Sequence, residues 1–230
     1  MTPRTRTLLL AGLSLLWATQ ALAHGVTDGD QLFIEQSAGS QLVPFAYLGA
    51  KHMVTGYDHL LFLVGVVFFL FRMREVVTHV TLFSLGHSTT LLLGVLGGTQ
   101  VDPYLIDAII GLSVVYKGVD NLGVFERFLG RQPNTKVAVT VFGLFHGLGL
   151  ATKLQDFSLD PDGLVPNIVA FNVGVEVGQV LALGGVLIAM GYWRRSASFE
   201  RHATAVNVVL VLAGLLLTAY QLTGFFGGTA

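Results

Sequence analysis

The 230-residue chain contains no cysteine and few charged residues. Without cysteine it can form no disulfide, thiolate metal site, iron–sulfur cluster or cysteine nucleophile. Charged residues make up 12% of the sequence, whereas soluble domains carry about 25%. The net charge is −1, and no basic run could follow a phosphate backbone, so we expect no nucleic-acid partner. A metal site would have to use imidazole, carboxylate, amide, hydroxyl or thioether groups.

What the sequence has in abundance is apolar residues. They form 53% of the chain, and the mean hydropathy is +0.68. Six apolar stretches each approach or exceed the ~20 residues that span a bilayer core. The sequence therefore predicts an all-α fold, a polytopic membrane helical bundle with lipid as its main solvent. The six predicted spans are 46–71, 76–97, 104–125, 137–154, 167–192 and 204–226.

The first 23 residues are typical of a cleaved secretory signal. Arg4 and Arg6 precede a short apolar run, and Ala21-Leu22-Ala23 has the A-x-A form of a cleavage site. An uncleaved first span is the alternative. Cleavage would leave His24 at the mature N-terminus, where it could chelate a cation with the free amine or simply be an exposed end. The predicted organisation is a signal peptide (1–23), a short periplasmic segment (24–44) and a transmembrane domain (45–230).

The charges of the connecting loops orient the predicted bundle. With the mature N-terminus outside, the loops after the first, third and fifth spans face the cytoplasm and carry most of the basic residues. The positive-inside rule requires this bias. We therefore predict a multi-pass protein of a bacterial inner membrane with both termini on the periplasmic side. The inward basic residues are Arg72, Arg74, Arg127, Arg131, Lys136, Arg194, Arg195 and Arg201, against Lys153 outside.

Several ionisable residues lie within the predicted spans, where charge is costly and usually functional. Counting along each span at about 1.5 Å per residue places Asp58, His59, His87 and His146 near mid-membrane. Glu176, on a fourth helix, lies slightly toward the outside, and His52 lies near the outer mouth. His52 and His59 share a helix face, but about 10 Å along the axis of a regular helix separates them. They are therefore predicted to be two successive stations on one path. The candidate metal ligands are His52, Asp58, His59, His87, His146 and Glu176.

Imidazole and carboxylate together favour a divalent transition metal such as nickel, cobalt, copper or zinc. The alternative is that these groups form hydrogen bonds between helices. His79 and Asp107 are assigned to that structural class. Lys117 and Asp120 are predicted to form an internal ion pair or a proton-linked element. The sixth span is nearly all aliphatic and is predicted to lie at the periphery.

The stretch from His52 to His59 has the form H-x5-D-H and continues as Leu60-Leu61-Phe62-Leu63. It resembles the first-span signature of the HupE/UreJ family, membrane proteins associated with hydrogenase and urease maturation. The resemblance implies a helical bundle and nickel uptake, with His52, Asp58 and His59 on the metal path.

A second signature of that family, F-H-G-x-x-H-G-x-E, is matched only by Phe145-His146-Gly147. Its later His and Glu are absent, because Leu150 and Lys153 stand in that part of the chain. Only His146 is carried over from this motif. Glu176, on the next span, is our own candidate for the missing carboxylate. The departure is typical of a divergent branch of the family.

The leading hypothesis is a permease for a divalent transition metal, with nickel favoured, that works without catalysis. One alternative is an intramembrane zinc hydrolase, although the chain has no H-E-x-x-H motif. Another is a non-transporting hydrogenase or urease accessory protein. Haem ligation by His59, His87 and His146 is a lesser option. The expected partners are the lipid bilayer, the metal ion and, by resemblance, hydrogenase or urease maturation proteins.

Overall fold

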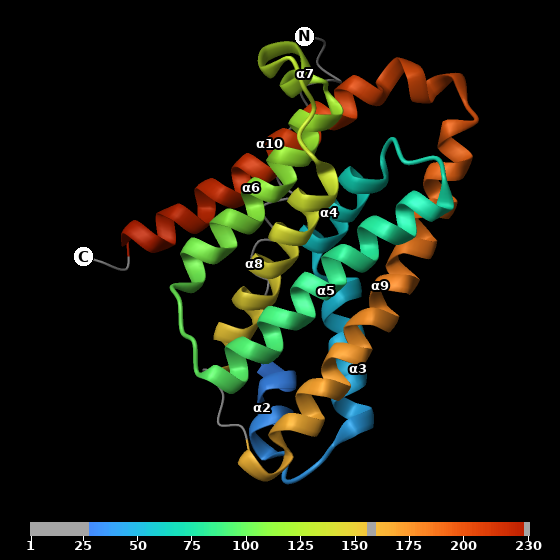
Figure 1. Ribbon diagram of the computed structural model, residues 1–230. Helices are drawn as coiled ribbons and strands as arrows, with labels where there is room; N and C mark the ends of the chain where they lie inside the picture. The colour runs from blue at the N-terminus through green and yellow to red at the C-terminus, as the bar shows by residue number, and fades with distance from the viewer. Residues whose placement is uncertain (1–27, 156–159, 228–230) are drawn as a thin grey trace, which may run out of the picture.

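The computed structural model describes residues 28–155 and 160–227, whose regular structure is entirely helical (Figure 1). This confirms the all-α prediction. The signal peptide and His24 lie outside the described residues. The helices are α2 (Asp28–Gln36), α3 (Leu42–Thr55), α4 (Tyr57–Val67), α5 (Met73–Gly97), α6 (Pro103–Asn121), α7 (Val124–Leu129), α8 (Thr135–Gln155), the 3-10 turn η2 (Pro161–Gly163), α9 (Leu164–Arg194) and α10 (Ala197–Gly227).

Four helices in the described part of the chain are long and apolar enough to cross a membrane: α5, α8, α9 together with η2, and α10. Helix α6 has 19 residues, about 28 Å at the usual rise, but it carries Asp107, Lys117 and Asp120. The count of six spans therefore remains a prediction.

The first predicted span is divided into two helices by Gly56. Helix α3 ends at Thr55, and α4 begins at Tyr57 and has 11 residues. At 1.5 Å per residue α4 is about 16 Å long, half the thickness of a bilayer core. Neither half resembles the single helix that the apolar run predicts.

The other long helices form three close pairs: α3 with α9, α5 with α8, and α6 with α10. Glycines line every pairing. A Cβ at Gly174 would collide with the carbonyl of Ala46, one at Gly147 with that of His87, and one at Gly214 would lie 2.8 Å from that of Gly111. Small residues of this kind let helix backbones approach closely in membranes. Helix α10 lies beside α6 at one side of the bundle (Figure 1).

We expect Gly174→Ala to destabilise the α3–α9 pair, because the new methyl group would meet backbone atoms that cannot move aside. Overpacking of this type costs about 1–3 kcal/mol. Gly184→Ala is the matched control on the same helix, since a Cβ there has no neighbour within 4 Å. The apparent melting temperature of the purified protein in detergent checks this. Equal melting temperatures for the two variants would contradict the close approach.

Helix α4 occupies the centre of these pairs (Figure 1). Phe62 and Val66 pack against buried side chains of α5, α6, α8 and α10, and Leu63 and Val67 pack against α5 and α9. The short helix that begins with Tyr57, Asp58 and His59 is therefore enclosed by the rest of the bundle.

Arg194, at the end of α9, closes the carbonyl end of α4. Its guanidinium donates to the backbone oxygens of Val67, Phe68 (2.8 Å) and Leu70 (3.1 Å). The last carbonyls of a helix have no partner within the helix, and in an apolar setting an unsatisfied carbonyl is costly. A cation at this end also suits the negative pole of the helix dipole.

Two ion pairs hold the charges of α6. Lys117 Nζ lies 2.5 Å from Asp120 Oδ2, which confirms the predicted internal pair, and Gln132 donates to the other oxygen at 3.0 Å. Lys153 of α8 lies 2.7 Å from Asp107. These carboxylates are thus committed to lysine partners.

The segment before α3 packs against one end of the bundle. Ile34 of α2 is buried in a cluster with Phe45 and Ile168. Nearby, the backbone N–H of Gly39 donates to Asp160 at 2.7 Å. This bond and the N–H of Asp162 lower the pKa of the Asp160 carboxyl. Helix α3 begins at Leu42, three residues before the predicted start of the transmembrane domain.

Candidate metal centre

The break at Gly56 shapes the centre of the candidate site. The N–H of Gly56 donates to the carbonyl of His52 at 2.9 Å, which is the last hydrogen bond of α3. Helix α4 then starts at Tyr57. Because the chain turns here, the imidazole rings of His52 and His59 lie only 5.0 Å apart, centroid to centroid. The prediction that His52 and His59 are too far apart to share an ion is therefore wrong, since it assumed one regular helix.

His87 and His146 reach the same place from the α5–α8 pair. Gly147 abuts the backbone of His87, so the two helices meet at the level of their histidines. The ring of His59 lies 5.0 Å from that of His146 and 6.2 Å from that of His87. The imidazoles of His52, His87 and His146, from α3, α5 and α8, thus all lie near the ring of His59 on α4.

The possible ligand atoms form two groups, and His59 belongs to both. His52, His59 and His87 make one group, and Asp58, His59 and His146 make the other. Within each group the ligand atoms all lie within 4.8 Å of one another. His52 is half-buried and the other four side chains are buried. We call these five residues the His–Asp cluster.

Hydrogen bonds orient two of the rings. Nδ1 of His146 lies 2.8 Å from the carbonyl of Phe142, and since a carbonyl only accepts, this nitrogen carries the proton. Nδ1 of His59 lies 3.2 Å from Asp58 Oδ1. A histidine that donates from one nitrogen to a carbonyl or carboxylate offers the lone pair of the other nitrogen to a metal.

The cluster contains one carboxylate, that of Asp58. Asp58 is 2% exposed, so little water screens its charge, and in such surroundings a dication is strongly attracted. The lysines of α6 and α8 are already paired with Asp120 and Asp107. Four imidazoles with one carboxylate suit nickel, copper, zinc or iron better than calcium or magnesium, which prefer all-oxygen sites.

Glu176 is the sequence-predicted ligand that the structure places apart from the two groups. Its side chain is exposed, and its Oε1 accepts a hydrogen bond from Ser84 Oγ. The face of α9 that packs on α3 carries Gly174 and Gly178. Glu176 is two residues from each and so points to the other side of the helix.

Two kinds of residue at the centre escaped the sequence analysis. One is Gly56, where a Cβ would lie 2.8 Å from His59 Nδ1. The other is the pair of aromatic residues, Phe62 and Phe83, that packs against the histidine rings. The ring of Phe83 lies 4.9 Å from that of His146 and 6.4 Å from that of His59, and Phe62 lies 5.7 Å from His146. Phe83 stands four residues before His87, and this helical spacing was the available signal.

Comparison with known proteins gives one match. The family described as HupE / UreJ protein matches residues 28–228, which includes every member of the His–Asp cluster. No curated protein and no solved structure matches the chain.

Proposed function

This chain belongs to the HupE / UreJ family, and from that premise we propose that it carries a divalent transition metal across the bacterial inner membrane. Nickel is the favoured ion, with cobalt, copper and zinc as alternatives. The observation that supports this function best is the pair of ligand groups sharing His59, enclosed by helices suited to lipid. Buried ionisable residues in such helices usually mark an ion pathway.

The two groups suggest how an ion moves. Each offers three ligand atoms, fewer than the four protein ligands of a closed structural zinc site. An ion held by His52, His59 and His87 can exchange partners for Asp58 and His146 while His59 stays bound. Stepwise exchange of this kind avoids releasing a bare dication into an apolar interior, where desolvation is very costly.

The proposed orientation follows from the sequence. A mature N-terminus outside and basic loops inside place the loop between α4 and α5 in the cytoplasm. His52, on the helix before Gly56, then lies on the periplasmic side of His59. In this orientation the ion enters past His52 and leaves toward the α4–α5 loop.

The test is nickel accumulation by sealed proteoliposomes that contain the purified protein. We expect the wild-type protein to accumulate nickel and Asp58→Asn to lose this activity. The substitution preserves the volume of the side chain but removes the charge that offsets the dication. If the wild-type protein binds nickel but the proteoliposomes do not accumulate it, the transport proposal is overturned and an accessory role is favoured. Wild-type accumulation by Asp58→Asn would show that the ion travels elsewhere.

A further inference from the structure

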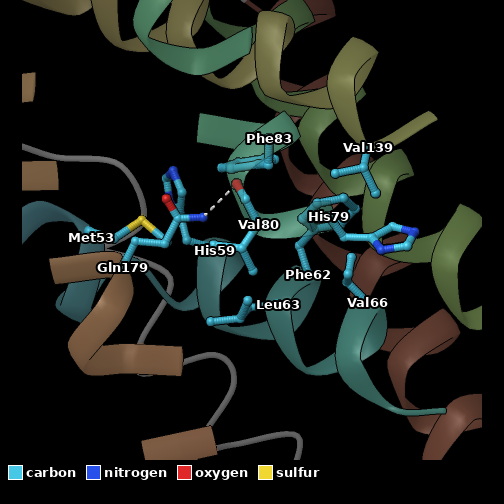
Figure 2. Close-up of a pocket in the computed structure, with 10 residues that line it drawn as sticks. All are labelled: Met53, His59, Phe62, Leu63, Val66, His79, Val80, Phe83, Val139 and Gln179. Carbon is cyan, nitrogen blue, oxygen red and sulfur yellow. Dashed lines mark hydrogen bonds between the residues drawn. The ribbon is translucent and has the colours of Figure 1, made fainter. Parts of the chain in front are cut away.

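A pocket beside the His–Asp cluster is lined by residues of α3, α4, α5, α8 and α9 (Figure 2). Three of the ten residues that line it are polar: His59, His79 and Gln179. The other seven are aromatic, aliphatic or methionine side chains. His79 precedes His87 on α5 by eight residues, or about 12 Å along the helix. The pocket therefore joins a cluster histidine to a histidine nearer the N-terminal end of α5.

His79 has the tautomer of a metal ligand. Its side chain is buried, and its Nδ1 lies 2.8 Å from the backbone carbonyl of Glu75. The carbonyl can only accept, so Nδ1 carries the proton and Nε2 bears the lone pair. This is the arrangement that His146 has within the cluster.

Gln179 adds a polar acceptor to the lining of the same pocket. The side chain is 2% exposed, and its Nε2 donates to the carbonyl of Val80 at 3.3 Å, as Figure 2 shows. Its Oε1 is buried and has no hydrogen-bond partner among the described residues. An unsatisfied buried acceptor costs about 1–3 kcal/mol. A cation or its bound water in the pocket would satisfy this oxygen.

Building on the transport function proposed above, we propose that this pocket is the next leg of the metal path and that His79 is a second metal-binding station. The ion leaves His59, passes the side-chain oxygen Oε1 of Gln179 and binds Nε2 of His79. The rings of Phe62 and Phe83, whose centroids lie 5.4 Å apart, line this pocket together with His59 and His79. A dication cannot stay in so apolar a passage, so these rings form the barrier between the two stations.

His79→Asn tests the second station. The Asn amide can still donate to the Glu75 carbonyl, so the local hydrogen bond is preserved, but the ligating nitrogen is lost. The control is Thr78→Ala, at the neighbouring half-buried residue, whose hydroxyl also donates to a carbonyl of its own helix, that of Arg74. Each variant is assayed for equilibrium nickel binding in detergent and for the initial rate of nickel uptake in proteoliposomes.

We expect His79→Asn to bind nickel at the His–Asp cluster as tightly as wild type while its uptake rate falls about tenfold, a loss typical of removing a group that supports a metal site. Thr78→Ala should match wild type in both. Wild-type uptake by His79→Asn would overturn the second station. Loss of tight binding by this variant would also overturn it, because His79 would then belong to the cluster. Failure of the wild-type protein to accumulate nickel would instead refute the transport function.

Discussion

Replacing His59 with alanine is expected to abolish both nickel binding and nickel uptake. His59 is the residue that the two ligand groups share, so its loss leaves each group with two ligand atoms. A site with two of its three protein ligands binds a dication too weakly to offset the cost of dehydration. Metal analysis of the purified variant and nickel accumulation by cells at matched expression check this result. His52→Ala should weaken uptake without abolishing it, because His52 belongs to one group only.

The control for His59→Ala is His202→Ala. His202 is exposed near the start of α10, and its Nδ1 lies 2.9 Å from the carbonyl of Ser198. It has the same chemistry as His59 but no place in the cluster, so we expect wild-type binding and uptake. Substantial nickel accumulation by His59→Ala would exclude the His–Asp cluster as the metal site, whatever other variants did.

The sequence predicts most helices well because an apolar run of about 20 residues leaves the backbone few alternatives in lipid. The predicted span 76–97 corresponds to α5, and 137–154 to α8, within three residues at each end. The same argument misplaced the first span. A run that is apolar throughout does not reveal a break, and Gly56 is one of 28 glycines in the chain.

The sequence predicts the depth of the candidate ligands along their helices, but not the side of the helix on which each one lies. Counting residues placed His59, His87 and His146 at one level, and the structure brings their rings together. Counting cannot tell which side of a helix faces its neighbours when polar residues are few and the whole surface is apolar. For this reason Glu176, predicted at a similar depth, lies on the exposed side of α9. The helix partners that decide this direction are visible only in three dimensions.

We expect Gly56→Ala to weaken nickel binding by about 10–100-fold, the loss usual when the support of a metal ligand is disturbed. The backbone angles at Gly56, φ −69° and ψ 98°, are open to alanine. However, the new Cβ would lie 2.8 Å from His59 Nδ1 and 3.2 Å from Asp58 Oδ1. Alanine also favours helix over glycine by about 1 kcal/mol, which favours joining α3 to α4. A continuous helix would move His52 and His59 apart to about 10 Å along its axis.

Gly191→Ala separates these effects from a general response to alanine. It makes the same change within α9, where a Cβ has no neighbour within 4 Å, so it raises helix propensity without touching another residue. We expect this variant to bind nickel like wild type and to melt at the same or a slightly higher temperature. Gly56→Ala should keep a similar melting temperature, because its contacts are with the side chains of the cluster and one carbonyl, that of His52. Wild-type affinity in Gly56→Ala would mean that the break between α3 and α4 does not position the metal ligands. If Gly56→Ala instead binds nickel more weakly and melts like wild type, the absence of a Cβ at position 56 is what allows His52 and His59 to face the same ion.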